Sequence, residues 1–315
     1  MSEKFESQFQ DASFEFLAIF LEGLPFIFIG TIVSGFLGTY LPKNAFERWL
    51  PKNRTLAILM SGLLGAIFPV CECAVVPVIR RLVKNGLPVS CALTYMLAAP
   101  IFNPVTAIST YKAFNDSYSV AGARLFMAYA IAVLVGLVMA RIAHSHFLKP
   151  SVQKGGHEHH HPRNLTSAMN NSLRDLMDVG LYFTIGVVLT ALMKSTVIDP
   201  NSDFWINLES NSLLATPAMM VLAFILSLCS TSDAFIAANI GNFKYGPKLA
   251  FMVFGPMMDA KLIFLYSTVF RWKFIVALLI SLFILTGAFS LFAEGAIEQL
   301  YQIELEAIQT KEVSP

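Results

Sequence analysis

Long apolar segments constrain this chain more than any other feature of its sequence. A helix that crosses the hydrocarbon core of a bilayer needs about 20 mostly apolar residues. Several segments reach or approach this length: residues 17–41, 55–79, 87–111, 120–143, 179–193, 210–232, 249–270 and 274–293. The chain is therefore predicted to be an all-α integral membrane protein with about eight membrane segments.

The composition agrees with this prediction and excludes several classes of protein. Of 315 residues, 56% are hydrophobic and 14% charged, whereas an average soluble domain has about 25% charged residues. The net charge of +1 provides no field that would attract a nucleic acid. The four cysteines lie in apolar segments, which argues against an extracellular disulfide framework. We expect no cleavable signal peptide, because the first residues are polar and acidic.

Two of the segments cannot be continuous lipid-facing helices. In one, Pro69 and Pro77 flank Glu72, and in another Pro100 and Pro104 lie at the middle. Proline removes a helical hydrogen bond and crowds the preceding turn. Broken backbone at membrane depth is tolerated only where protein or a water-filled cavity satisfies its polar groups. These segments are therefore predicted to be broken or re-entrant helices.

Matches between the two halves of the chain indicate an internal duplication. The matched positions are Glu22 with Asp178, Gly30 with Gly186 and residues 100–103 with 256–259, each at an offset of 156, and Cys71 with Cys229 at an offset of 158. Several matches in the same order at nearly one offset are not expected by chance. We predict a first four-segment repeat at 1–143, a His-rich polar linker at 144–172, a second four-segment repeat at 173–295 and an acidic C-terminal tail at 296–315.

The two repeats can be parallel or inverted. Eight plain spans with a cytoplasmic N-terminus would make them parallel. If the segments that carry Cys71 and Cys229 are re-entrant hairpins, the repeats are inverted and the N-terminus lies outside. The positive-inside rule favours inverted repeats, because this arrangement places more Lys and Arg in the cytoplasm.

The motif Cys71-Glu72-Cys73 is the most distinctive local feature. Thiolates are soft ligands that suit Cu(I), Zn(II) and, by the same softness, thiophilic metalloids. On irregular backbone both sulfurs can face one guest, whereas on a regular helix they would point about 200° apart. The alternative is that cysteine serves as a small buried apolar residue, which is the interpretation we favour for Cys91.

Ionisable residues also lie within membrane segments or at their edges. They are Glu22, Glu72, Asp178, Asp233, Asp259 and Lys261. A charge at the bilayer centre costs about 2.5–3.5 kcal/mol even on insertion scales, so several at one depth indicate pairing, protonation or a polar cavity. Asp259 and Lys261 would not face each other on a regular helix, but Pro256 could allow it. Glu72, Asp233 and Asp259 are candidates for a proton relay.

Other charged residues have a plainer interpretation. Glu22 and Asp178 can lie at the level of the headgroups. Arg124 and Arg141, near the two ends of an apolar segment, are expected to extend toward the headgroups.

Histidines cluster in the central linker. His157, His159, His160 and His161 are candidate metal ligands, because clustered imidazoles bind Zn, Ni, Co or Cu without fixed geometry. The alternative is a solvated low-complexity linker. The sequence contains no phosphate-binding loop and none of the hydrolase motifs H-E-x-x-H or G-x-S-x-G. We therefore expect neither ATP-driven pumping by this chain alone, nor an enzyme, nor a cofactor.

Four strings resemble a known family. P-V-C-E-C-A-V-V-P-V and A-L-T-Y-M-L-A-A-P-I-F-N-P in the first half, with C-S-T-S-D-A-F-I-A-A and F-G-P-M-M-D-A-K in the second, resemble the predicted-permease family that includes the trivalent organoarsenical efflux permeases. The resemblance covers nearly the whole chain outside the linker and the tail. It implies a bacterial inner-membrane permease and a role for cysteines in binding the guest. It places the shared core at Cys71, Cys73, Pro100, Asn103, Pro104, Ser232, Asp233, Pro256, Asp259 and Lys261.

We therefore expect a secondary transporter in the bacterial inner membrane. It would move a small solute, with thiophilic metal or metalloid species as candidates, through a site at the interface of the repeats. The candidate substrate-binding residues are Cys71, Glu72, Cys73, Pro100, Asn103, Cys229, Ser232, Asp233, Asp259 and Lys261. The alternative is a metal-binding membrane receptor or assembly subunit without transport activity. Expected partners are the solute and the lipid bilayer, with a homo-oligomer left open and no nucleic acid.

Overall fold

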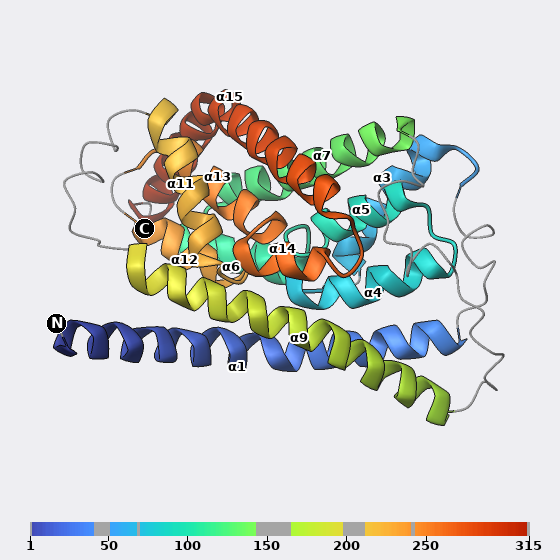
Figure 1. Cartoon of the computed structure of the whole chain (residues 1–315). Coiled ribbons are helices and arrows are strands. Elements are labelled where there is room, and N and C mark those ends of the chain that lie inside the picture. Colours follow the sequence, from blue (N-terminus) through green and yellow to red (C-terminus); the bar gives the residue numbers. More distant parts are fainter. Residues whose placement is uncertain are drawn as a thin grey trace.

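The computed structural model describes residues 2–40, 51–67, 70–142, 165–197, 212–240 and 243–313. The regular secondary structure in these ranges is α-helical (Figure 1). The helices are α1 (Ser2–Tyr40), α3 (Arg54–Ile67), α4 (Glu72–Lys84), α5 (Val89–Ala98), α6 (Pro104–Ala113), α7 (Tyr118–Arg141), α9 (Leu165–Val197), α11 (Ser212–Leu226), α12 (Ser232–Asn239), α13 (Tyr245–Met257), α14 (Ala260–Tyr266) and α15 (Trp272–Val313). The histidines of the predicted linker lie outside the described residues.

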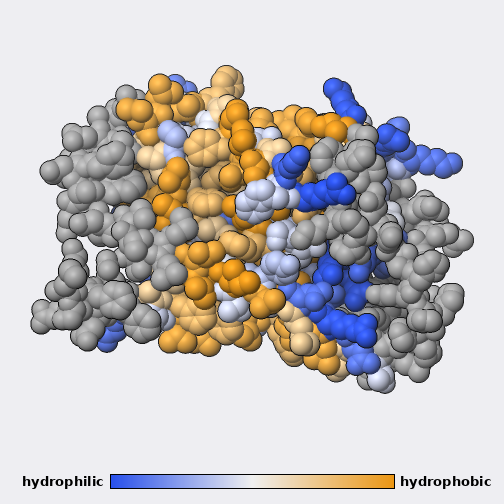
Figure 2. Space-filling model, in the orientation of Figure 1, coloured by the Kyte–Doolittle hydropathy of each residue, from blue (hydrophilic) through white to orange (hydrophobic). Residues whose placement is uncertain are grey.

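Within the described residues, four helical stretches are long and apolar enough to cross a membrane. They are Ala12–Phe36, Tyr118–Arg141, Tyr245–Tyr266 and Trp272–Tyr301. Shorter apolar helices, α3, α5 and α11, occupy three more of the predicted segments. Figure 2 shows apolar side chains gathered over the middle of one face, with hydrophilic ones toward one end. This is the pattern of a multi-pass membrane protein, and four of the about eight predicted membrane segments correspond to helices of spanning length among the described residues.

The two central helices of the bundle are α5 and α13. Every residue of α5 is buried, and so is every residue of α13 except Tyr245. The longer helices α7 and α15 pack against them, and they expose large apolar side chains such as Phe126 and Phe292 on their other faces. Helices α1 and α9 lie side by side along one face of the molecule and run in opposite directions (Figure 1).

Both proline-containing segments of the first half are interrupted, as the sequence predicts. Helix α3 ends at Ile67 and α4 begins at Glu72, while α5 ends at Ala98 and α6 begins at Pro104. Asn103 caps α6, because its side chain accepts a hydrogen bond of 2.8 Å from the backbone N–H of Thr106.

The second half has the same two interruptions. Helix α11 ends at Leu226 before α12, and α13 ends at Met257 before α14. Asp259 caps α14 by accepting a 2.7 Å hydrogen bond from the N–H of Leu262. Asn103 and Asp259 are matched in the predicted duplication, and each caps the short helix that follows a break.

The C-terminal part of α15 caps a helix of the first half. The Glu304 carboxylate accepts hydrogen bonds from the N–H groups of Tyr118 and Ser119, at 2.8 and 3.2 Å, and from the Ser117 hydroxyl at 2.8 Å. Burial raises the pKa of Glu304, but these hydrogen bonds outweigh burial and hold the pKa below its usual value. The segment predicted as an acidic tail is helical as far as Val313.

Replacing Gly136 with alanine should destabilise the protein. A Cβ at this position of α7 would collide with the Thr94 hydroxyl of α5 and would lie 3.0 Å from Ile58. Overpacking of this kind costs about 1–3 kcal/mol. Gly122 on the same helix is the matched control, since a Cβ there meets nothing within 4 Å. In thermal unfolding in detergent, Gly136→Ala should lower the unfolding temperature and Gly122→Ala should not. An equal decrease for both variants would contradict the packing described.

Replacing Glu304 with glutamine should destabilise the protein in a pH-dependent way. A pKa that is lowered by folding stabilises the protein above the usual glutamate value, and this contribution is lost as the pH falls through the folded value. A charged acceptor strengthens such bonds by about 1 kcal/mol over a neutral one. The difference in unfolding free energy between the wild type and Glu304→Gln should be present in full at pH 7 and be smaller at about pH 3, below the usual glutamate pKa of about 4.3. An equal difference at both pH values would contradict this assignment.

Candidate functional site

A small cavity lies at the break before α4. Its volume is about 20 Å³, which is room for about one water molecule. It is lined by Ile19, Glu22, Gly23, Phe26, Cys71, Glu72, Cys73, Phe183, Cys229 and Lys261. The wall therefore includes five of the residues that were predicted to bind substrate, from both halves of the chain.

Three free thiols reach this cavity from two breaks. Cys71 has extended backbone, with φ −67° and ψ 162°, and is the last residue before α4. Because the helix begins only after Cys71, the side chains of Cys71 and Cys73 both reach the cavity, as the sequence analysis required for a shared guest. Cys229 lies in the nonhelical stretch before α12, and its sulfur is 3.7 Å from the Thr231 hydroxyl.

Lys261 is the centre of a buried charge cluster beside the thiols. Its ammonium lies 3.4 Å from Glu72 Oε1 and 3.5 Å from Asp259 Oδ2, and it donates a 2.7 Å hydrogen bond to the Ser227 carbonyl. Asp259 faces Lys261 because it lies outside α14 as its cap. Among the described residues, Glu72 Oε2 has no hydrogen-bond partner. The cluster thus sets two carboxylates against one ammonium, at side chains that are at most 4% exposed.

The matched glycines of α1 and α9 lie against the helices that carry Cys73 and Lys261. A Cβ on Gly30 would lie 2.7 Å from the Ala74 Cβ of α4, and one on Gly186 would lie 2.9 Å from the Lys261 Cα of α14. Glycine therefore allows α1 to approach the thiol-bearing helix and α9 to approach the lysine-bearing helix.

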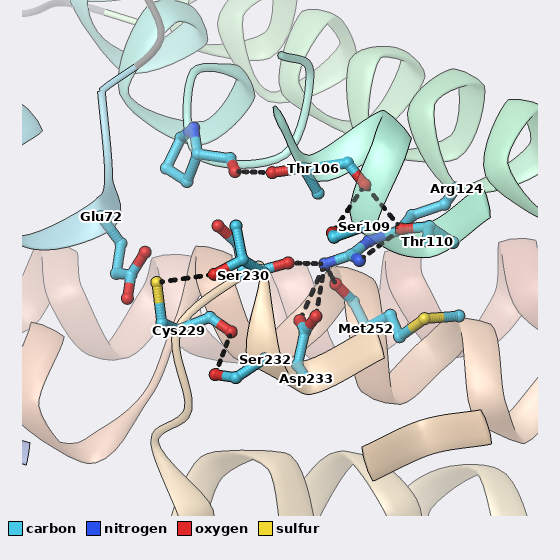
Figure 3. A network of polar contacts seen from close by, with 12 residues as sticks. Glu72, Thr106, Ser109, Thr110, Arg124, Cys229, Ser230, Ser232, Asp233 and Met252 are labelled. Carbon is cyan, nitrogen blue, oxygen red and sulfur yellow. Dashed lines mark hydrogen bonds and ion pairs between the residues drawn. The ribbon is translucent and has the colours of Figure 1, made fainter. Parts of the chain in front are cut away.

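A second network lies on the other side of the 227–231 stretch and is built around Arg124 (Figure 3). Its Nη2 lies 2.8 Å from both carboxylate oxygens of Asp233, and its Nη1 is 2.8 Å from the Thr110 hydroxyl. The expectation that Arg124 extends to the headgroups is wrong, because its side chain is only 1% exposed. The buried Asp233 and nearby backbone carbonyls provide the partners that the headgroups were expected to provide.

A third network joins α4, α9 and α1. Arg81 Nε lies 2.9 Å from Asp175 Oδ2, and the Ser34 hydroxyl is 2.8 Å from the same oxygen. Asp178 pairs with Arg80 at 3.1 Å, while its own side chain is 57% exposed. Neither buried member of the Arg81–Asp175 pair was identified from the sequence.

The remaining predicted site residues lie outside the cavity wall. Asp233 pairs with Arg124, and the Ser232 hydroxyl is 3.1 Å from the Cys229 carbonyl. Asn103 caps α6 and donates hydrogen bonds to the Ala99 and Pro100 carbonyls, at 3.0 and 2.9 Å. His157, His159, His160 and His161 lie outside the described residues. In the part of the chain that the structure describes, no group of three or more His, Cys, Asp and Glu residues is arranged to hold a metal ion.

Comparisons with known proteins agree with the membrane architecture. The profile of a family described as "Predicted permease" matches residues 8–295. UPF0718 protein YcgR of Bacillus subtilis is 36% identical over 296 residues, which are 92% of this chain and 99% of that protein. A Streptococcus mutans protein, named as a subunit of a two-component membrane permease complex, is 35% identical over 266 residues, or 83% of this chain and 87% of that protein. No solved structure matches the chain.

Replacing Lys261 with methionine should strongly destabilise the protein. The substitution leaves Glu72 and Asp259 buried without their cation, and breaking a buried pair in this way costs about 3–5 kcal/mol. Lys112→Met is the matched control, because Lys112 pairs with Asp116 at 2.7 Å and the two side chains are 60% and 51% exposed. Exposed pairs contribute about 0–1 kcal/mol. The free energy of unfolding of both variants can be measured in detergent. Similar decreases in the two variants would show that the buried cluster stabilises the protein no more than an exposed pair does.

Proposed function

The chain belongs to the predicted-permease family, and from that membership we propose that it is a secondary transporter that carries a small solute through the cavity between its two halves. The observation that carries the proposal is that Cys71 and Cys73 of the first half and Cys229 of the second line one small cavity. Since the sequence has no phosphate-binding loop, the energy would come from an ion gradient or from the gradient of the solute. Glu72, Asp233 and Asp259 remain candidates for a proton relay.

The proposed transport site lies between inverted repeats. The opposite directions of α1 and α9 support the inversion (Figure 1). The same cap at the matched residues Asn103 and Asp259, and the breaks at matched places, support the repeat itself. Inverted repeats with broken helices that meet near the midplane are a recurring plan of secondary transporters. The linker at 144–172 would then face the cytoplasm.

The proposed solute is a thiophilic metal or metalloid species. Three thiols around one cavity supply soft ligands, and the carboxylates of Glu72 and Asp259 add negative charge that favours a cation. The cavity has room for about one water molecule, so binding would require the two breaks to separate. The described state is accordingly proposed to be a closed one.

A second protein component is a proposed partner. The name of the Streptococcus mutans relative describes a subunit of a two-component complex, which supports looking for such a partner here. The alternative function, a metal-binding receptor or assembly subunit without transport, is not favoured by the permease family. The histidines of the linker remain candidate metal ligands, and self-association remains a prediction.

Transport measurements on cysteine variants test the proposal. Purified protein in proteoliposomes should move methylarsenite, Cu(I) or Zn(II) above the level of empty liposomes. Cys71→Ser, Cys73→Ser and Cys229→Ser should each lower the transport of the accepted solute by about 10- to 100-fold, as loss of a metal-site contact does. Cys91→Ser is the control, because Cys91 lies on α5 away from the cavity wall.

Two results would contradict the proposal. If all four serine variants transported like the wild type, the thiols would not bind the solute. If the protein bound these metals but moved none of them, the receptor alternative would be correct.

A further inference from the structure

The stretch 227–231 between α11 and α12 is held in an unusual backbone conformation. Ser227 has φ 47°, which lies in the left-handed region that residues other than glycine seldom adopt. Such strain persists only where surrounding contacts impose it. The carbonyls of a nonhelical stretch at membrane depth also need partners from the protein. The contacts of this stretch therefore decide where its middle residue, Cys229, stands.

Two buried cations bind this stretch at its two ends. Lys261 donates a 2.7 Å hydrogen bond to the Ser227 carbonyl, two residues before Cys229. Arg124 Nη2 donates a 2.9 Å hydrogen bond to the Ser230 carbonyl, one residue after it. The backbone on each side of Cys229 is therefore held by a buried cation.

Arg124 connects the stretch to α12 and α13. The same Nη2 lies 2.8 Å from each Asp233 oxygen, in the first turn of α12, and 3.0 Å from the Met252 carbonyl of α13. Because Arg124 belongs to α7, one guanidinium of the first half fixes three points of the second half. Figure 3 shows Asp233 directed at Arg124, while the Cys229 sulfur lies on the opposite side of the turn, toward Glu72.

We propose that Arg124 is a positioning residue for Cys229. By holding the Ser230 carbonyl and the start of α12, it fixes the Cys229 thiol in the cavity wall and prevents the stretch from relaxing away from it. This inference rests on the proposed function only for the use of Cys229 in transport. The position of the thiol can be measured without any transported solute.

The competing explanation is that Arg124 and Asp233 form an ion pair that only stabilises the fold. Two variants separate these roles. Asp233→Asn removes the carboxylate charge and leaves the Arg124 donors on the Ser230 and Met252 carbonyls. The double variant Arg124→Met with Asp233→Asn removes both charges together, which avoids an unpaired buried charge but leaves the carbonyls without their donor.

Alkylation of Cys229 by a maleimide reports its exposure. The measurement uses the full chain with Cys71, Cys73 and Cys91 replaced by serine, so that Cys229 is the sole cysteine. The protein is alkylated in detergent, and mass spectrometry measures the extent of the reaction. The double variant should be alkylated about tenfold faster or more, because the local opening that exposes the thiol is favoured when the anchoring bonds are lost. Asp233→Asn alone leaves Arg124 as an unpaired buried cation and should lower the unfolding temperature, but it should raise the alkylation rate of Cys229 much less, because the bonds to the carbonyls remain. Equal rates in the double variant and its parent would overturn the proposal.

A second single-cysteine version of the protein distinguishes local opening near Cys229 from opening of the whole fold. Here Cys91 is the sole cysteine; it is 2% exposed on α5 and lies outside the cavity wall. Its alkylation rate should not change in the double variant, and a parallel acceleration of Cys91 and Cys229 would overturn the proposal. If the double variant fails to fold, Arg124→Lys replaces it, since lysine keeps the charge but not the planar set of donors. That variant should raise the Cys229 rate by an intermediate amount, and an unchanged rate would overturn the proposal.

The two proposals fail separately. If Cys229→Ser transports normally while the alkylation results hold, the role of Cys229 in transport is wrong and the positioning role of Arg124 stands. If transport depends on Cys229 but the alkylation rate of Cys229 is the same with and without the Arg124 substitution, the positioning role is wrong and the transport proposal stands.

Discussion

The structure depends on one constraint: helices that break at membrane depth must find partners for their exposed backbone groups within the protein. Among the described residues, three of the four breaks meet this requirement with side chains. Asn103 and Asp259 cap the helices that follow two of the breaks, and Lys261 and Arg124 bind the carbonyls of a third. Lys261 and Arg124 in turn pair with buried carboxylates, so this part of the interior charge follows from the broken backbone.

The buried ion pairs join the two halves of the chain. Lys261 pairs with Glu72, Asp233 with Arg124 and Asp175 with Arg81, and each pair has one member from each half. A bilayer offers little hydrophobic force to hold one helix against another. These charge pairs therefore help to hold the two halves together beside the cavity.

The sequence predicted the parts of this arrangement that depend on local chemistry. Proline placed the breaks, and the irregular backbone at Cys71 lets two near neighbours share one cavity, as expected. The structure also confirms that Asp259 and Lys261 face each other. The position of Arg124 was not predictable, because its apolar flanks indicate a snorkelling residue and only the tertiary fold brings Asp233 to it. The same holds for Arg81 and Asp175, which are 94 positions apart in sequence.

The pairing of Arg124 with Asp233 has a consequence for how the protein is made. The two residues are separated by 109 positions, and a ribosome adding about 5–20 residues per second needs roughly 5–20 s to cover that distance. During this interval Arg124 has been synthesised, but its carboxylate partner does not yet exist. Arg124 therefore cannot reach its described arrangement until this part of the second half has been synthesised. Biogenesis of this chain is accordingly a joint event of both halves, and neither half reaches its buried arrangement alone.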